Sequence, residues 1–353
     1  MALGWESLLR VTNSDSWGTP GTWSKSGRFL YADSSSLDYG GEVSERDAKM
    51  IGNRESADNT FGVDRYNPGG EFTFQPKPDD ILPILMAHFQ SCGVISAGGT
   101  YEFYRLNKNL DWTATTATNW AVNPYSINIA QTYGKTLVGA ATGANAIFYQ
   151  NGIVDKLSFT LKYGEDFSCN VGMKFRTATR LNLPATFGDY PNVYGSLSAF
   201  ARLVDYHGTL EIAGETLDMD AWTGNFNNNS EGRAKIGQRG YVRFPFSGKW
   251  IADGEFTMEL QRELNQLAAG SFGVATVSIM SAAGIGIKIF QPNIAWKPWN
   301  PDVSDGQSVI DVTLPYRAYP PTGSSGPSTR VLVYTGSVYG TLLWGFGGTG
   351  GYV

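Results

Sequence analysis

The stretch GEFTFQPKPDDILPILMAHF, which runs from Gly70 to Phe89, joins a strand pattern directly to a helix pattern. Phe72 and Phe74 alternate with Thr73, and this period of two is typical of a strand that turns one face to the core. The sequence therefore predicts a strand that ends near Phe74 and leads into a helix.

The helix pattern carries its own start and stop signals. Asp79 and Asp80 can accept hydrogen bonds from the unpaired N–H groups of the first turn, and Pro83 falls in that turn, where its missing N–H costs little. Gly93 can end the helix in the left-handed conformation, which glycine adopts without strain. The apolar positions at helical spacing are Ile81, Leu82, Leu85 and Phe89.

A second copy of this unit reads DGEFTMELQRELNQL, from Asp253 to Leu267. Its helical part ends at Gly270 and places three leucines on one face, namely Leu260, Leu264 and Leu267. Upstream, Ile-Gly-Asn-Arg at 51–54 matches Ile-Gly-Gln-Arg at 236–239. The two matches lie 185 and 184 positions apart, so we interpret them as an internal duplication.

The composition is that of a folded, strand-rich chain. Its 353 residues suit two domains of ordinary size, and 42% apolar with 17% charged residues is too hydrophobic for disorder. Forty-three glycines and few long helical patterns favour short strands joined by tight turns. We expect a mainly β protein with a first unit at 1–183, a second at 192–335 and a Gly- and aromatic-rich tail at 336–353. Pro184–Pro191 is the expected linker.

Alternation predicts further strands in both halves. The clearest is a pair between Gly152 and Phe175, whose apolar residues alternate with polar or small ones on either side of a turn at Gly164. The charged segment 36–70 is expected to be a long loop. A final pair should join Ile285–Phe290 to Val309–Tyr316 through the loop Pro292–Asp305. The other expected strands are Arg28–Ala32, Thr100–Leu106, Ser126–Ala130, Thr209–Ile212, Leu217–Trp222 and Arg330–Tyr334.

Few residues are suited to catalysis or to metal binding. With a net charge of −5 and no cluster of Lys and Arg, the chain is a poor candidate for tight nucleic-acid binding. We expect His88 to be a satisfied polar group on the helix and His207 to lie in a turn. Cys92 and Cys169 lack a Cys-x-x-Cys spacing and are expected to be buried thiols. We therefore predict no catalytic, cofactor-binding or metal-binding residues and no enzymatic activity.

Three further motifs allow both a functional and a structural interpretation. Asn228-Asn229-Ser230 fits a glycosylation acceptor, but a turn is favoured because no secretory signal is present. Trp296 and Trp299 could stack on a sugar or a base, although anchoring of their loop against the sheet is favoured. The glycines at 345–350 lack the following helix that a dinucleotide loop requires.

The first ten residues, MALGWESLLR, lack the basic start and apolar run of a signal peptide. No segment has eighteen consecutive apolar residues. We therefore expect a soluble product of the cytoplasm with no membrane partner.

Several segments together form a recognisable pattern. They are the arm with Gly4–Ser7 and Trp17–Pro20, the polar loop with Gly52 and Arg54, the stretch from Gly70, the pair Gly152–Phe175, and the run Leu210–Phe256 with its turn Asn227–Asn229. In these segments the chain resembles the tail tube proteins, or major tail proteins, of long-tailed, siphovirus-like bacteriophages. The resemblance covers about residues 4 to 335, and the chain departs from the family in the insertion at 107–124 and in the tail after Tyr334.

The resemblance implies two tandem β-sandwich or partial-barrel units of the tail-tube type, each with one flanking α-helix. It implies a structural subunit that polymerises as stacked rings around a channel that conducts genomic DNA into the host. The implied partners are further copies of the chain, the tape measure protein and phage DNA in the lumen, and the tail terminator and tail tip proteins at the ends. The implied location is the tail of the virion after synthesis in the host cytoplasm, and no cofactor is implied.

Three expectations follow from this resemblance. Two units in one chain would supply two of six positions in a ring, so we expect a trimer with pseudo-sixfold symmetry rather than a hexamer. We expect more carboxylates than Lys and Arg on the channel wall, because basic side chains bind phosphate through counterion release. We expect the loop 36–70 to become ordered against a neighbouring ring. The alternative is a carbohydrate-binding β-sandwich module of a phage or bacterial surface protein, which the Trp and Tyr content supports.

Overall fold

The computed structural model is mainly β, with 67% of its described residues in strands. The strands form antiparallel ladders, and the described part of the chain contains one α-helix. The residues that the structure describes are 8–13, 28–30, 32–38, 41–45, 61–90, 92–96, 99–105, 125–133, 144–183, 203–231, 250–259, 272–281, 283–299, 311–321 and 327–335.

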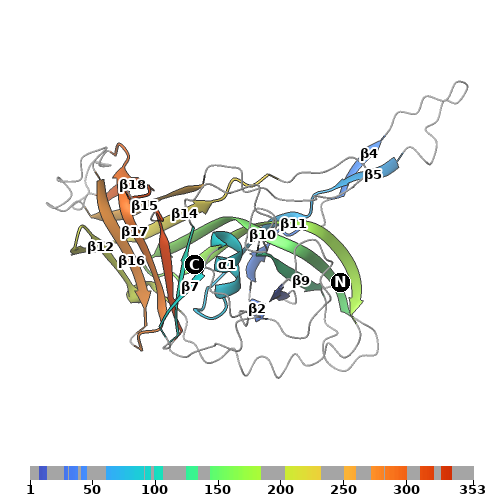
Figure 1. Ribbon diagram of the computed structural model, residues 1–353, viewed down its shortest axis with the longest axis horizontal. Helices are drawn as coiled ribbons and strands as arrows, with labels where there is room; N and C mark the ends of the chain where they lie inside the picture. The colour runs from blue at the N-terminus through green and yellow to red at the C-terminus, as the bar shows by residue number, and fades with distance from the viewer. Residues whose placement is uncertain are drawn as a thin grey trace, which may run out of the picture.

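Strands of the N-terminal half form one set of ladders (Figure 1). Their bounds are β1 Leu8–Asn13, β2 Arg28–Leu30, β3 Ala32–Ser35, β6 Gly69–Phe74, β9 Ile127–Tyr133, β10 Ala144–Lys162 and β11 Ser168–Leu183. β1 pairs with β2 and with β9, and β9 pairs with β10. β10 pairs with β11, β11 with β6, and β6 with β3.

Strands of the C-terminal half form a second set. Their bounds are β12 Gly208–Ile212, β13 Glu215–Leu217, β14 Ala221–Asn227, β15 Ile251–Glu259, β16 Phe272–Met280, β17 Gly286–Trp296 and β18 Asp311–Ala318. β12 pairs with β13 and with β16, and β16 pairs with β17. β17 pairs with β18, β18 with β15, and β15 with β14. A 3-10 turn, η4 Asp205–His207, precedes β12.

One ladder joins these sets into one sheet. β10 pairs with β14 over Lys156–Lys162 and Ala221–Asn227. β8, Thr100–Tyr104, pairs with β19, Arg330–Tyr334, and β19 also pairs with β17. β7, Cys92–Ser96, completes this edge beside β8. Followed from strand to strand, the ladders among the described residues never return to their starting strand, so the sheet is open and branched.

The hairpin of β10 and β11 confirms the strand pair that the sequence predicts, and it is longer than predicted. Its turn has Gly164 in the left-handed region, with φ of 77°. The alternating apolar side chains are buried, namely Val154, Leu157, Phe159, Leu161, Phe167, Cys169, Val171, Met173 and Phe175. The strand at Arg330–Tyr334 also matches its predicted bounds.

The predicted pairing of Ile285–Phe290 with Val309–Tyr316 is wrong. Both strands exist, but β17 and β18 meet only where Ile294–Trp296 lies opposite Tyr316–Ala318. The edge of β17 at Gly286–Phe290 is taken by β19, and β18 pairs along its full length with β15. β17 also continues through Pro292, where the sequence predicts a loop.

The helix α1, Leu82–Phe89, follows β6 as predicted, and Pro83 lies in its first turn. The predicted cap by Asp79 and Asp80 is wrong. The residue before the helix is Ile81, which has no side-chain cap, and the two aspartates belong to the preceding turn, in which the N–H groups of Asp80 and Ile81 donate to the carbonyl of Lys77.

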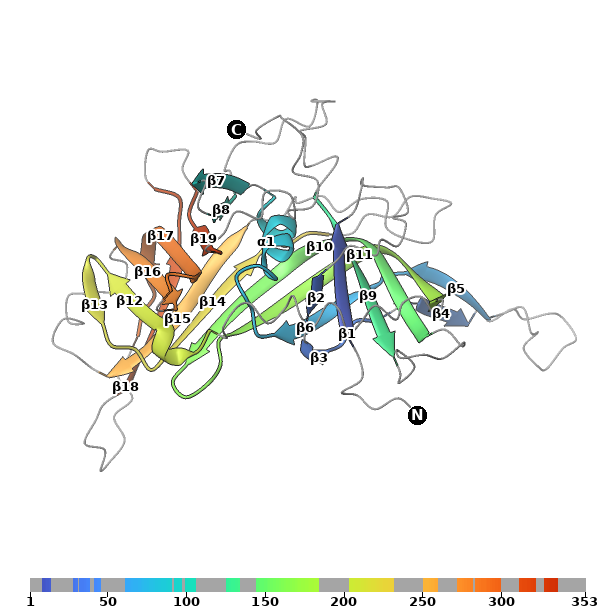
Figure 2. The same cartoon turned by 90° about the horizontal axis from the view of Figure 1, so that it is seen from below.

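The predicted end of the helix at Gly93 is also wrong, because Gly93 lies in β7. Gln90 takes the left-handed conformation instead, with φ of 62°. Its side chain compensates, since Nε2 donates to the carbonyls of Ala87 at 2.7 Å and Tyr125 at 3.0 Å. All eight helix residues are buried, and Figure 2 shows α1 against one side of the sheet that contains β10, β11 and β14.

The segment 36–70, predicted as a loop, contains a hairpin. β4, Gly41–Glu45, pairs with β5, Phe61–Tyr66, as a separate two-stranded sheet that projects from the body (Figure 1). The strand signal in this segment is short, because only Phe61 and Val63 on either side of Gly62 alternate, and many charged residues surround them.

Several predictions lie outside the described residues. These are the second helix at 260–270, both Ile-Gly-x-Arg segments, the linker 184–191, the insertion 107–124 and the tail 336–353.

Candidate functional site

One side of the central sheet carries polar side chains, whereas the other side is the core. We call this surface the polar face and define it on six adjacent strands: β6, the Ser168–Lys174 part of β11, the Lys156–Lys162 part of β10, β14, β15 and β18. Along each strand, exposed or half-buried residues alternate with buried ones. Residues of the polar face include Glu71, Thr73, Asn170, Lys174, Lys156, Ser158, Thr160, Lys162, Thr223, Asn225, Asn227, Asp253, Glu255, Thr257, Glu259, Asp311, Thr313 and Arg317.

The strand register aligns these side chains in rows across the sheet. One row runs Thr73, Asn170, Ser158, Asn225, Asp253 and Arg317. In this row Asn170 Nδ2 donates to Thr73 Oγ1 at 3.1 Å, and Ser158 Oγ donates to Asn225 Oδ1 at 2.6 Å. Short hydroxyl and amide side chains therefore bind one another along this row.

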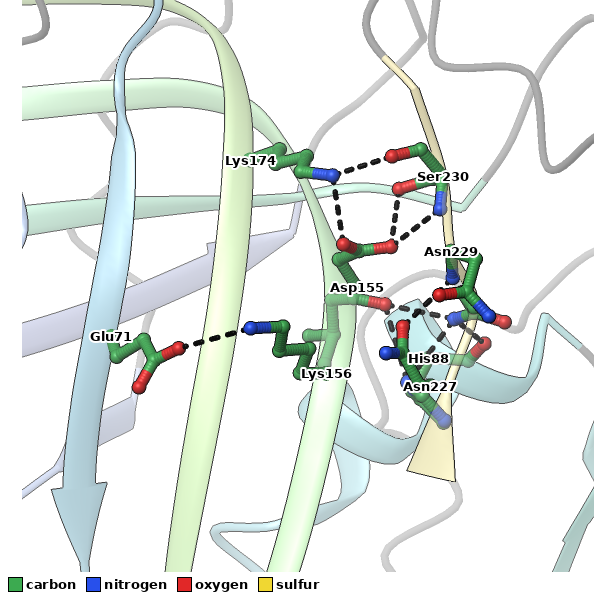
Figure 3. A network of polar contacts seen from close by, with 10 residues as sticks. Glu71, His88, Asp155, Lys156, Lys174, Asn227, Asn229 and Ser230 are labelled. Atoms are coloured by element: carbon green, nitrogen blue, oxygen red, sulfur yellow. Dashed lines mark hydrogen bonds and ion pairs between the residues drawn. The ribbon is translucent and has the colours of Figure 1, made fainter. Parts of the chain in front are cut away.

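The cations of the polar face each lie beside a carboxylate. Glu71 Oε1 is 3.7 Å from Lys156 Nζ, although β11 lies between their strands. Gly172 stands between them in the register, and a Cβ there would lie 3.1 Å from Lys156 Cβ and 3.6 Å from Glu71 Oε1. The lack of a side chain at Gly172 leaves the space through which the two charges meet (Figure 3).

A second carboxylate, that of Asp253, forms ion pairs with two cations. Asp253 Oδ2 lies 3.6 Å from Arg317 Nη2 and 3.8 Å from Lys297 Nζ, which follows β17. Lys162 Nζ lies 2.7 Å from Glu165 Oε1 at the hairpin turn.

Three carboxylates of the polar face have no described ion pair. Glu255 lies opposite Thr223 and Pro315, and Glu259 lies opposite Asp311. Like charges directly opposite one another repel, so this end of the sheet carries uncompensated negative charge.

Aromatic side chains fill the other side of the same strands. Phe159 stacks on Trp222 and Phe167, and Tyr316 stacks on Phe256 with ring centroids 4.8 Å apart. Trp222 Nε1 donates to the Tyr316 hydroxyl at 3.1 Å, and burial raises the pKa of Tyr316 well above its ordinary value. The hydroxyl is therefore a neutral structural group.

A buried polar junction lies where β10 changes partners. β9 pairs with β10 up to Gly152 and β14 pairs with it from Lys156, and a bulge at Asp155 separates the two ladders. The Asp155 carboxylate, 7% exposed, accepts from the N–H of Ser230 at 2.7 Å and from its hydroxyl at 2.5 Å. Lys174 Nζ contacts Asp155 Oδ2 at 2.8 Å and donates to the Ser230 carbonyl (Figure 3).

Asn228 links this junction to the helix. Its Nδ2 lies 3.1 Å from His88 Nδ1, 3.0 Å from the His88 carbonyl and 2.9 Å from the Val154 carbonyl. Arg105 Nη1 donates to Asn228 Oδ1. Burial, together with the nearby charge of Arg105, lowers the pKa of His88 to about 3, and burial lowers the pKa of Arg105 to about 10. His88 is thus a neutral residue that holds α1 to the β10–β14 ladder.

The surroundings of the motifs with two possible interpretations are visible in the structure. Asn228 is fully buried, so a glycan has no room there, and the N–H of Asn229, whose φ is 48°, donates to Asn227 Oδ1 at 2.8 Å. Trp296 is 2% exposed and packs on Phe256 and Tyr316, but it is the last residue of β17 and not part of a loop, whereas Trp299 beyond the strand is partly buried against the core. Cys169 is a free buried thiol, and burial raises its pKa well above the ordinary value.

Asp218 and Asp220, two acidic residues close together in the sequence, are exposed between β13 and β14. His207 ends η4, where its Nδ1 accepts from the N–H of Val204 at 3.3 Å. Sequence reasoning missed Asp155, and its only signal is that two adjacent charged residues, Asp155 and Lys156, interrupt the run from Gly152 to Leu157.

The described part of the chain holds no group of three or more His, Cys, Asp or Glu residues that could bind a metal ion. None of its helices is long and apolar enough to cross a membrane. No protein-family model matches the sequence, and no curated protein matches it.

Proposed function

We propose that this chain is a structural subunit of a bacteriophage tail tube, which polymerises as stacked rings around a channel for genomic DNA. The resemblance described above points to the family. The observation that carries the proposal is that the same order of strand pairing occurs twice along the chain and that one ladder joins the two occurrences.

The two sets of ladders correspond strand by strand. Each antiparallel pairing in the first set has an antiparallel counterpart in the second. The correspondence, in chain order, takes β1, β2, β3, β6, β9, β10 and β11 to β12, β13, β14, β15, β16, β17 and β18. The two Gly-Glu-Phe-Thr segments lie in corresponding strands, β6 and β15. This supports two tandem tail-tube-like units, at 1–183 and 192–335.

The β10–β14 ladder supports polymerisation into rings. It joins a hairpin strand of the first unit to β14, the counterpart of β3, so it is a side-by-side junction between units within one chain. The same junction made between chains would continue the sheet, and closure of a ring would remove the open edges. A ring of three chains would then contain six units.

The polar face fits the inner wall of such a ring. It continues without interruption from β6 of the first unit to β18 of the second, and α1 packs on the opposite side of the sheet. A wall of short polar side chains with surplus carboxylates would let a polyanion pass without strong binding.

Electron microscopy of the purified, concentrated protein tests this function. We expect ring stacks or tubes. A monodisperse monomer at all concentrations, with no tube in any salt or pH condition, would contradict the proposal.

Symmetry decides the stoichiometry within such tubes. We expect a reconstruction with threefold symmetry to resolve three chains per ring, with β6 and β15 in alternate, equivalent positions of the wall. Six whole chains per ring would show that the second unit decorates an ordinary hexamer.

The alternative, a carbohydrate-binding module, has less support. Sugar-binding sites stack sugars on accessible aromatic rings, but Trp222 and Trp296 are buried. The large exposed aromatics of the described residues are Tyr163, in the turn between β10 and β11, and Tyr319, which follows β18. Binding of glycans by a monomer that forms no tubes would favour this alternative.

A further inference from the structure

We infer that Glu71 and Asp253 act as charge masks, which keep the cations of the polar face from binding duplex DNA. This inference rests on the proposed function, because it assigns the polar face to the side that DNA passes. It goes further by naming the residues that prevent retention. The observation behind it is the pairing of carboxylates and cations across strands.

The geometry gives these carboxylates a role other than holding the fold. Glu71 and Lys156 are 48% and 59% exposed, and exposed ion pairs contribute little to stability. The ion pair between them nevertheless depends on Gly172, because the lack of a side chain there leaves room for the contact. Asp253 lies between Arg317 and Lys297 and reaches both. In each case the carboxylate and its cations come from different strands or from the residue after one, so their approach depends on the sheet and not on local sequence.

The chemistry follows from how proteins bind DNA. Each cation that contacts a phosphate releases a counterion and strengthens binding. A cation held within 4 Å of a carboxylate has its charge largely neutralised, so a phosphate gains little by approaching it. Glu71 masks Lys156, and Asp253 masks Lys297 and Arg317, so these cations can stabilise the face without attracting the polyanion.

The test uses the double variant Glu71→Gln, Asp253→Asn, which removes the masks and keeps side-chain size. Binding of a fluorescent 30-base-pair DNA duplex is measured by anisotropy at several salt concentrations, with unpolymerised full-length protein. We expect wild type not to bind. The variant should bind with a log–log salt slope of about −2.7, or about a 40-fold loss of affinity between 50 and 200 mM salt, for three freed cations.

Two matched controls separate masking from overall charge. Glu211→Gln, Glu215→Gln changes the net charge by the same amount on the remote β12–β13 hairpin, where both carboxylates are exposed. Glu255→Gln, Glu259→Gln does so on the polar face itself, at carboxylates without a described ion pair. We expect neither control to bind DNA.

Equal binding by either control would overturn the inference, because overall or local charge would then explain the result. Absence of binding by the Glu71→Gln, Asp253→Asn variant, with an unchanged circular dichroism spectrum, would also overturn it. Failure of wild type to form tubes contradicts the proposed function and is read by microscopy, independently of the anisotropy.

Discussion

The two Gly-Glu-Phe-Thr segments, Gly70–Thr73 in β6 and Gly254–Thr257 in β15, are alike where the backbone and core decide and differ on the polar face. Both phenylalanines are buried, at 1% and 0% exposure, and each lies opposite an aliphatic residue of the next strand. Both glycines pack closely against the backbone on their other side. A Cβ at Gly70 would come 2.4 Å from the carbonyl oxygen of Ser36, just after β3, and a Cβ at Gly254 would come 2.3 Å from the carbonyl oxygen of Thr223 in β14.

The glutamates differ because their surroundings differ. Glu71 reaches Lys156 across Gly172, whereas Glu255 lies between Thr223 and Pro315 and has no described ion pair. Packing constraints therefore account for the glycine and the phenylalanine of the motif, while the charge environment of the glutamate depends on strands far away in sequence.

The largest effect should come from the core phenylalanines. Phe72→Ala and Phe256→Ala should each lower the free energy of unfolding by about 3–5 kcal/mol, because each removes a fully buried ring. Urea unfolding followed by circular dichroism measures the loss. Tyr163→Ala, which removes a ring that is 80% exposed, should change it by less than about 0.5 kcal/mol. A cost below 1 kcal/mol at only one of the two phenylalanines would break the equivalence of the segments.

Substitutions at the two glycines should lower the free energy of unfolding by unequal amounts, unlike those at the two phenylalanines. Gly254→Ala should cost about 1–3 kcal/mol through crowding against Thr223 and the Tyr316 hydroxyl. Gly70→Ala should cost about 1–3 kcal/mol more, because its φ of 137° adds backbone strain. Gly214→Ala isolates the strain, since Gly214 has φ of 90° and open space around it. Equal losses at Gly70 and Gly254 would show that strain plays no part.

Sequence pattern predicted most of the strands and the helix because each rests on local alternation. Phe72 and Phe74 mark β6, and the apolar residues on either side of Gly164 mark the long hairpin; both predictions are confirmed. The helix end was mispredicted because Gln90, bonded through its side chain to Tyr125, replaced the expected glycine.

Partner choice and the polar junction were not predictable from local pattern. Nothing near β17 in the sequence indicates that β19, and not β18, pairs with it at Gly286–Phe290, because β18 is the nearer strand in the chain. Asp155 lies 75 residues from Ser230, and only the fold brings the carboxylate to that N–H. The ion pairs of the polar face have the same origin, because they join strands rather than neighbours in the chain.

Acid should weaken the surroundings of the first segment. The helix that follows β6 carries His88, and the only other histidine is His207. The pKa of His88 is 6.5 in an unfolded chain and about 3 when folded, so between these values only the unfolded state binds the proton. The stability present above pH 6.5 is therefore lost as the pH falls toward 3.

We expect this histidine to account for a loss of about 2 kcal/mol between pH 7 and pH 5. Urea unfolding at the two pH values measures it. His88→Gln should remove that part of the pH dependence, and His207→Gln should retain it. The same pH dependence in wild type and His88→Gln would show that other groups cause the loss.

The smallest effect on stability should come from the glutamates, where the two segments differ most. Glu71→Gln removes an ion pair whose partners are about half exposed, and such pairs contribute about 0–1 kcal/mol. Glu255→Gln removes a carboxylate without a described ion pair and should change the free energy of unfolding by less than about 0.5 kcal/mol. A double-mutant cycle with Lys156→Met measures the coupling of Glu71. A coupling above 2 kcal/mol would show that the ion pair stabilises the fold. Stability alone would then explain why Glu71 and Lys156 lie together on the polar face. A coupling near zero, together with DNA binding by the Glu71→Gln, Asp253→Asn variant, would separate the two roles, because the carboxylate would control charge on the surface without holding the strands together.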